Sequence, residues 1–198
     1  MQEEIKALDK MHNWDIMDLP PVKMAIDCKW VYKIKSRSDG SIERDKARLV
    51  AKGYHQEYGI DYEETFVPVA RLTLVWSLLA IVAAKRWQLF RMDVKNTFLN
   101  GDLQEEVYMK PPPGYEHPPN KVCRLHRALY GLKQAPRAWF STFSSTVHRF
   151  AFYSSPYDNA LFIRCTSKGY VILLLYVDDM IITESDLQGI QNLKQFLH

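Results

Sequence analysis

The chain has 198 residues, of which 47% are hydrophobic and 25% are charged, and its formal net charge is +3. This length suits one domain or slightly more, and this composition excludes a disordered or low-complexity protein. The longest apolar run, Val171 to Val177, is much shorter than the ~20 residues of a membrane-spanning helix. The polar, acidic N-terminus predicts no secretion signal. Cys28, Cys123 and Cys165 are far apart, which predicts free thiols in a reducing compartment.

The N-terminal part predicts a short helix followed by a hairpin. Residues 1–20 are amphipathic and polar, and they end at a Pro-Pro pair. Residues 30–35 alternate large apolar with basic side chains, which is typical of a half-buried strand. A turn signal at 38–41 then allows residues 44–54 to return as the second strand.

The middle of the chain predicts a helix and two strands. Residues 71–86 are apolar almost all round, which favours a buried helix. Residues 87–94 are expected to form a strand, and 100–102 a turn. A short strand at 107–109 ends at a Pro-rich segment, 110–114, which cannot continue a ladder.

The C-terminal part predicts two more helices and three strands. The expected strands are 159–165, 170–177 and 180–183, and the expected helices are 135–150 and 185–198. Strands and helices are mixed rather than strictly alternating, so the sequence predicts an α+β fold.

Basic residues are concentrated in two segments. Residues 28–52 carry eight Lys and Arg against three acidic residues, and residues 121–150 carry six with no acidic residue. This distribution predicts a polyanion such as nucleic acid held against one side of the molecule. The alternative is a solvated surface on which the cations have no ligand.

Two adjacent carboxylates, Asp178 and Asp179, interrupt two apolar runs and predict the tip of a tight hairpin. They could be a simple turn, because Asp favours turns. The competing hypothesis is a metal site, since Mg²⁺ prefers carboxylate oxygens on rigid elements. The candidate partner is Asp93, 85 residues before Asp178, at the end of another apolar strand. Carboxylates on neighbouring strands could hold two Mg²⁺ ions for phosphoryl transfer.

Five blocks, in order along the chain, resemble the reverse transcriptases of copia-type retrotransposons. They are residues 46–54 (KARLVAKGY), 59–66 (GIDYEETF), 93–101 (DVKNTFLNG), 129–139 (LYGLKQAPRAW) and the Tyr-Val-Asp-Asp tetrad at 176–179. The resemblance covers nearly the whole chain. It implies a right-hand polymerase palm, with an antiparallel sheet that carries helices on one face, and a fingers β-hairpin. The implied segments are a lead-in at 1–27, fingers at 28–86 and palm at 87–198.

The resemblance also implies the site residues. Asp93, Asp178 and Asp179 would be catalytic, with the metals held by Asp93, Asp178 and the carbonyl of Val94, and with Asp179 in support. Phe98 would stack under the incoming sugar and exclude a 2′-hydroxyl, although by itself a Phe there could be a core residue. The other implied nucleotide-binding residues are Lys46, Arg48 and Lys52 on the hairpin, with Tyr130, Gly131 and Gln134.

The implied cofactor is Mg²⁺, as two ions, with Mn²⁺ as a substitute. The implied partners are an RNA template, a DNA primer, a dNTP and the parent Pol polyprotein, with integrase upstream and RNase H downstream, and no membrane. The implied location is the cytoplasm, in a virus-like particle, with the nucleus as the alternative.

Four features depart from the family pattern. Trp76 stands where Arg is usual, Thr97 where Ala is usual, and Glu184 where a small residue is common. Thr97 is expected to add bulk beside the nucleotide pocket. The primer grip, thumb and RNase H regions that would follow Leu197 are absent from this sequence.

These departures keep open a second hypothesis, an inactive retroelement fragment that only binds nucleic acid. A third hypothesis is a metal nuclease, against which Phe98 argues, because a nuclease has no need to sort sugars.

Overall fold

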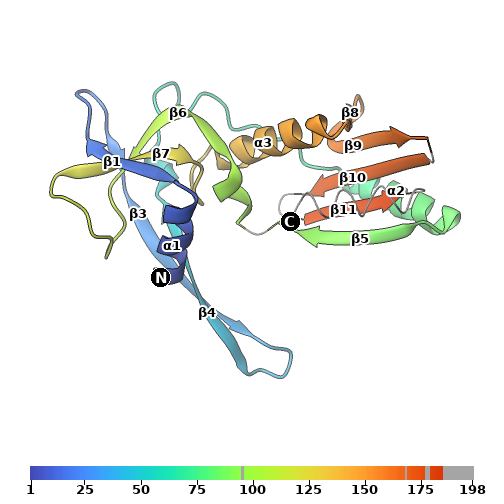
Figure 1. The fold of residues 1–198 in the computed structure, drawn as a ribbon, viewed down its shortest axis with the longest axis horizontal. Helices are drawn as coiled ribbons and strands as arrows, with labels where there is room; N and C mark the ends of the chain where they lie inside the picture. The colour runs from blue at the N-terminus through green and yellow to red at the C-terminus, as the bar shows by residue number, and fades with distance from the viewer. Residues whose placement is uncertain (95, 168, 177–178, 185–198) are drawn as a thin grey trace. The chain divides into compact units, whose positions relative to one another are not determined.

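The computed structural model describes residues 1–94, 96–167, 169–176 and 179–184 (Figure 1). The chain divides into two compact units that are interleaved in sequence. The first contains Met1–Phe66 and Phe98–Thr142, and the second contains Val67–Thr97 and the chain from Phe143 onward. The boundary expected between residues 86 and 87 falls inside the second unit.

The first unit contains a four-stranded sheet, a separate hairpin and an N-terminal helix. Its elements are α1 (Gln2–Lys10), β1 (Trp14–Asp18), β2 (Ala25–Ile26), β3 (Cys28–Ser36), β4 (Ile42–Ala51), the 3₁₀ turn η1 (Gly53–His55), β6 (Asp102–Met109), β7 (Lys121–Arg127) and the start of α3 (Ala135–Arg149). The sheet order is β1-β7-β6-β2, and β3 pairs antiparallel with β4. The predicted hairpin is therefore confirmed, whereas the sequence patterns did not predict β1, β2 and β7.

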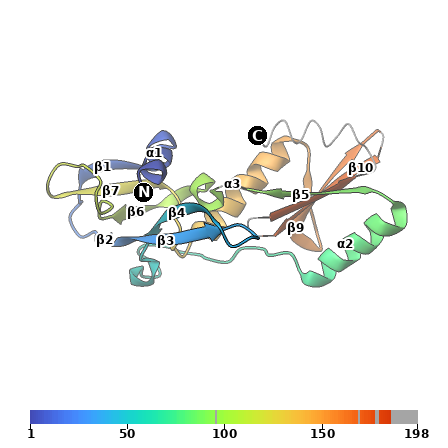
Figure 2. The ribbon, with the colours of Figure 1, turned by 90° about the horizontal axis from the view of Figure 1, so that it is seen from below.

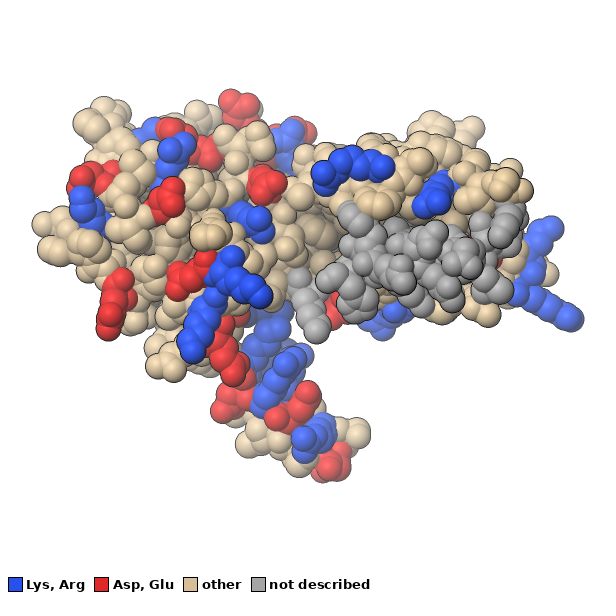
Figure 3. Space-filling model, viewed as in Figure 1, with Lys and Arg blue, Asp and Glu red and all other residues tan. Residues whose placement is uncertain are grey.

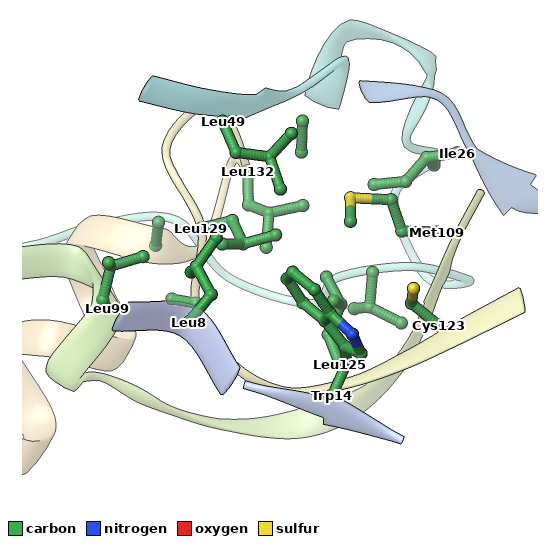
Figure 4. Close-up of a cluster of buried hydrophobic side chains, with 14 of the residues drawn as sticks. Leu8, Trp14, Ile26, Leu49, Leu99, Met109, Cys123, Leu125, Leu129 and Leu132 are labelled. Atoms are coloured by element: carbon green, nitrogen blue, oxygen red, sulfur yellow. The ribbon is translucent and has the colours of Figure 1, made fainter. Parts of the chain in front are cut away.

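One hydrophobic cluster holds the first unit together (Figure 4). Leu8 of α1, Leu49 of β4, Met109 of β6 and Leu125 of β7 are all at most 3% exposed and lie in this cluster. Burying such a side chain contributes about 1.5–3 kcal/mol. The cluster therefore ties the N-terminal helix and the base of the hairpin to the four-stranded sheet.

The second unit is built on a five-stranded antiparallel sheet of order β5-β11-β10-β9-β8. Its elements are α2 (Leu72–Lys85), β5 (Gln88–Asp93), the end of α3, β8 (Tyr153–Ser155), β9 (Asp158–Thr166), β10 (Gly169–Tyr176) and β11 (Asp179–Glu184), and the 3₁₀ turn η2 (Thr97–Asn100) joins the two units. These strands and the helix α3 follow the predicted positions closely, with β8 as an addition. The helix expected at 185–198 lies outside the described residues.

Helices cover both faces of this sheet, so the expectation of helices on one face is wrong (Figure 2). Leu161 of β9 packs with α2, while its neighbour Phe162 makes a ring contact with Phe143 of α3. Successive strand residues point to opposite faces, so the two helices lie on opposite sides. The reason is that β10 is apolar on both faces, and both therefore need cover.

The prediction that residues 71–86 form a helix is confirmed, but the expectation that this helix, α2, is buried is wrong for most of its surface. Leu78 and Val82 are buried, but Leu72 and Trp76 are 64% and 67% exposed. Because the sequence of this helix is apolar on nearly every side, it gives no periodic signal for the face that packs against the sheet. The mixture of helices and strands along the chain agrees with the predicted α+β fold. In the described part of the chain, no helix has the length and apolar character needed to cross a membrane.

Candidate functional site

The second unit places two of the predicted carboxylates opposite each other at one end of its sheet. Asp93 is the last residue of β5, Asp179 is the first of β11, and the two are directly paired across the ladder. Side chains of directly opposed residues share a face, with Cβ atoms about 4.5–5.5 Å apart. Asp178 lies outside the described residues, so its expected approach to Asp93 stays a prediction.

Asp179 is held by a cation that the sequence patterns did not single out. The guanidinium of Arg91 donates two hydrogen bonds to its carboxylate, from Nε to Oδ1 at 3.0 Å and from Nη2 to Oδ2 at 2.8 Å. These bonds raise the pKa of Arg91. A two-point contact fixes the plane of the carboxylate as well as compensating its charge.

The carbonyl of Val94, a predicted metal ligand, already has one partner. The hydroxyl of Thr97 donates to it at 2.8 Å, and Thr97 is only 1% exposed. A carbonyl oxygen has two lone pairs, so one remains available. Thr97 therefore holds the turn after Asp93 through a hydrogen bond. The sequence pattern predicted only the bulk that Thr97 adds relative to the usual Ala.

The donor atoms at this edge suit a hard divalent cation. Carboxylate and carbonyl oxygens are the ligands that Mg²⁺ prefers. Among the residues that the structure describes, no three His, Cys, Asp or Glu side chains form a metal-binding group. Asp93 and Asp179 supply two carboxylates, the Val94 carbonyl is a further oxygen ligand, and Asp178 stays the predicted third carboxylate. The residues present therefore fit the expected metal in their chemistry.

In the first unit, the register of the hairpin places its cations on one face. β3 residue 33 pairs with residue 46, and residue 35 with residue 44. Because cross-strand partners share a face and strand residues alternate, this face carries Lys29, Lys33, Lys35, Arg44, Lys46 and Arg48. We call these six residues the basic face of the hairpin. Figure 3 shows Lys and Arg along the projecting hairpin, with Asp and Glu between them.

The basic face contains two direct like-charge pairs, Lys33 with Lys46 and Lys35 with Arg44. Like charges directly opposite each other destabilise a hairpin. In the described part of the chain, none of the six residues forms an ion pair within 4.0 Å. Partial burial, with repulsion from Arg48 and Arg44, lowers the pKa of Lys46. The hairpin thus carries a positive field that the protein offsets only in part, through the charge of Glu4 near Lys46 and Arg48.

Three predicted nucleotide-binding residues lie in one aromatic stack. The guanidinium of Arg48 is 4.5 Å from the centroid of the Tyr130 ring, and that ring meets Phe98 edge-on at 5.2 Å between centroids. The Nε of Arg48 is buried and has no hydrogen-bond partner among the described residues. A buried donor without an acceptor is costly, and the contact with the Tyr130 ring offsets part of this cost.

Lys52, by contrast, is used inside the protein. Its Nζ lies 3.5 Å from the carboxylate of Asp27, which also pairs with Lys110 at 2.8 Å. The hydrogen bond from Lys110 is the main cause of the lowered pKa of Asp27. The structure therefore does not place Lys52 in the Arg48 stack.

Gly131 fulfils a requirement of the chain itself. It has φ of +91°, and a Cβ there would lie 2.2 Å from the carbonyl oxygen of Ala51. The N–H of Ala51 donates to the carbonyl of Tyr130 at 2.8 Å, so β4 lies directly against this turn. Only glycine allows that approach. The result is that Tyr130 is fixed beside β4.

Gln134 is 1% exposed, and its amide is bonded within the protein. It accepts from Gln56 Nε2 at 3.0 Å and donates to the carbonyl of Asp61 at 2.9 Å. Gln56 Oε1 in turn accepts the backbone N–H of Lys133 at 2.9 Å. This network fastens the loop after η1 to the turn before α3. A nucleotide contact by Gln134 stays a prediction.

The second basic segment is largely compensated. Its ion pairs are Lys121 with Asp18 at 2.8 Å, Arg124 with Glu106 at 3.4 Å, Arg127 with Asp102 at 3.9 Å and Arg137 with Glu64 at 2.7 Å. The acids come from other segments of the first unit, so this part of the predicted polyanion surface is weaker than its sequence indicated.

Comparison with known proteins identifies the family. Residues 11–198 match the sequence profile of the reverse transcriptase (RNA-dependent DNA polymerase) family. The chain belongs to this family. The reverse transcriptase domain is 44% identical, over 94% of its length, to the retrovirus-related Pol polyprotein from transposon RE1 of Arabidopsis thaliana. It is 42% identical, over 98% of its length, to that of transposon TNT 1-94 of Nicotiana tabacum.

These relatives are copia-type transposon polyproteins and are much longer than this chain. The reverse transcriptase domain covers 13% of the RE1 polyprotein and 15% of the TNT 1-94 polyprotein. It also matches the Gag-Pol polyprotein of transposon Ty1-ER2 from Saccharomyces cerevisiae, with 28% identity over 94% of the chain and 10% of the relative. The resemblance found in the five sequence blocks is thus confirmed.

Sequence reasoning missed two charged residues of this reverse transcriptase domain. Arg91 was inside a predicted strand, and only the strand register reveals that it meets Asp179. Glu4 lies in α1, one turn before the buried Leu8, and therefore faces the same way. Burial raises the pKa of Glu4, while the charges of Lys46 and Arg48 act in the opposite direction. An i, i+4 relation to an apolar anchor was the signal that could have pointed to Glu4.

Proposed function

We propose that this chain is the part of a copia-type Pol polyprotein that carries out RNA-directed DNA polymerisation. The observation that supports this most is the pairing of Asp93 with Asp179 across adjacent strands, in a domain of this family. The five-stranded sheet of the second unit is the palm in this proposal. The β3–β4 hairpin belongs to the fingers.

In this proposal Asp93, Asp178 and the Val94 carbonyl hold two Mg²⁺ ions, with Asp179 in support. When bound, the ions would help to deprotonate the attacking 3′-hydroxyl and stabilise charge on the phosphate. The protein's own contribution is positional, because Asp93 and Asp179 stand on paired strands and cannot move independently. Rigid positioning of this kind supplies much of the rate in phosphoryl transfer.

The stack in the first unit supports the nucleotide-binding part of the proposal. The guanidinium of Arg48 is held against the Tyr130 ring, and its positive charge would attract a triphosphate. Tyr130 supports Phe98 edge-on, so the Phe98 ring is backed by a second ring. Phe98 in this role would exclude the 2′-hydroxyl of a ribonucleotide. Lys46 would add charge to the same strand.

The basic face of the hairpin is the proposed contact for the RNA template or primer. This face carries six cations, and two pairs of them repel each other. When they bind phosphates, counterions are released from the nucleic acid, which favours binding. The parent polyprotein, with integrase before this domain and RNase H after it, is the proposed source. A cytoplasmic virus-like particle is the proposed location.

Primer extension on an RNA template with Mg²⁺ tests the proposed function. We expect weak, non-processive incorporation of deoxynucleotides by the chain, abolished in Asp93→Asn. Lys85→Gln is a suitable control, because it changes an exposed residue at the end of α2. Incorporation that persists in Asp93→Asn would contradict the proposal.

The same experiment separates a second candidate function, nucleic-acid binding without turnover. The uncompensated basic face favours it, because this face needs no metal. RNA binding that falls with salt, without incorporation in any variant, would support this second function and reject the first for the isolated chain.

A further inference from the structure

We propose that Arg91 is a positioning residue that withholds the Asp179 carboxylate from metal, so that the metal site is built around Asp93. This inference rests on the proposed function, because it concerns the same metal site. It goes beyond that function by assigning a role to a residue outside the five family blocks.

The geometry is that of a clamp. Arg91 is two residues before Asp93 on β5, and therefore points to the same face of the sheet. Its own cross-strand partner is Ile181, whereas Asp179 is the partner of Asp93. The guanidinium thus reaches diagonally across the ladder to Asp179, which is within range for a long side chain. Both carboxylate oxygens of Asp179 receive a hydrogen bond, at 3.0 and 2.8 Å.

This contact has two consequences for a divalent cation. The carboxylate of Asp179 is oriented toward Arg91, so a metal must compete with two charge-assisted hydrogen bonds to use it. The positive charge of Arg91 also offsets one of the negative charges beside Asp93. Metal binding is therefore weaker than two free carboxylates would allow, and Asp93 remains the uncommitted carboxylate of this pair.

Titration of Mn²⁺, followed by electron paramagnetic resonance on the full chain, tests the inference without any activity measurement. We expect Arg91→Gln to bind Mn²⁺ about four- to sixteenfold more tightly, the size of effect that one charge exerts on a divalent ion at roughly 5–10 Å in water. Arg86→Gln is the matched control. Arg86 lies beyond the far end of β5, roughly 16 Å from Arg91 along the strand, where salt screens its charge.

Two further variants decide between orientation and bare charge. Arg91→Lys keeps the charge but loses the fork, so we expect part of the gain in Mn²⁺ affinity. In an Asp179→Asn background, Arg91→Gln should have a smaller effect, because only the bare charge of Arg91 is then removed and no carboxylate is released. An undiminished effect in that background, or unchanged affinity in Arg91→Gln, would overturn the inference.

Asp93→Asn separates this failure from failure of the proposed metal site. If Asp93→Asn lowers Mn²⁺ affinity while Arg91→Gln matches wild type, the metal site stands and the role of Arg91 is rejected. If Asp93→Asn leaves Mn²⁺ affinity unchanged, both are rejected.

Discussion

The two basic segments look alike in sequence and differ in structure. Cations of β7 and α3 meet acids from distant segments, as Lys121 meets Asp18 and Arg137 meets Glu64. Cations of the hairpin face one another instead, as Lys33 faces Lys46. A cation paired within the protein has its charge compensated there, whereas one that faces another cation keeps its charge available to a ligand. The difference teaches that local net charge predicts a polyanion surface only where the fold leaves that charge uncompensated.

The largest expected effect is the loss of RNA binding when the basic face is neutralised. Substituting Lys33, Lys35 and Arg44 with Gln should lower affinity for single-stranded RNA about 100-fold at 0.1 M salt, with the salt slope reduced by about 2. The same triple variant should be more stable by about 0.5–1 kcal/mol, because two like-charge pairs disappear. Fluorescence anisotropy across a salt series measures the first change, and thermal unfolding measures the second.

The next effect concerns the buried amide network of Gln134. It distinguishes a structural role for this residue from the predicted contact with a nucleotide. Gln134→Leu removes the hydrogen-bond partner of Gln56 Nε2 and that of the Asp61 carbonyl, which should cost about 1–3 kcal/mol of stability. Urea unfolding gives this value. RNA affinity should stay within about twofold of wild type under folded conditions, since hydrogen bonds within the protein supply no counterion release. A stable variant with impaired nucleotide binding would instead assign Gln134 to the ligand site.

A third variant neutralises cations of the second basic segment, as the counterpart of the hairpin variant. Substituting Lys121, Arg124 and Arg127 with Gln breaks three exposed ion pairs, each worth about 0.2–1 kcal/mol. Stability should therefore fall by a small amount, while RNA affinity changes less than about threefold. If this variant loses as much RNA affinity as the hairpin variant, the distinction between the two segments is wrong.

The smallest expected effect is a pH dependence at the base of the hairpin. Because burial raises the pKa of Glu4 above its ordinary value of 4.5, the folded state holds this proton more tightly than the unfolded state. Stability from this group is therefore present at low pH and is lost as pH rises from about 4.5 through the raised pKa. Glu4→Gln should flatten that dependence, measured by urea unfolding at several pH values. Glu3→Gln, an exposed neighbour in the same turn, is the control and should keep it.

Patterns of local sequence predicted those parts of the fold that depend on local sequence. The alternation at 30–35 predicted β3, and the apolar runs around the Asp pair predicted β10 and β11. β7 was missed, because its charges were interpreted as a ligand surface before its partners in β1 and β6 were known. Propensity cannot locate a strand whose pattern is set by tertiary ion pairs.

The candidate site shows the same limit. Asp93 followed from its place at the end of an apolar strand and Phe98 from the family resemblance. By contrast, Gln56 and Gln134 meet across 78 residues of sequence, and Arg91 meets Asp179 across 88. Neither contact has a local signature. The two interleaved units have the same origin, since each is assembled from segments that are distant along the chain.

Photo-crosslinking tests most directly whether nucleic acid lies on the basic face. A single-stranded RNA containing 4-thiouridine would be bound to the chain at low salt, irradiated and digested, and the crosslinked peptides identified by mass spectrometry. The account predicts crosslinks within residues 29–48, which fade as salt is raised. Crosslinks confined to residues 121–137, with none in the hairpin, would contradict it.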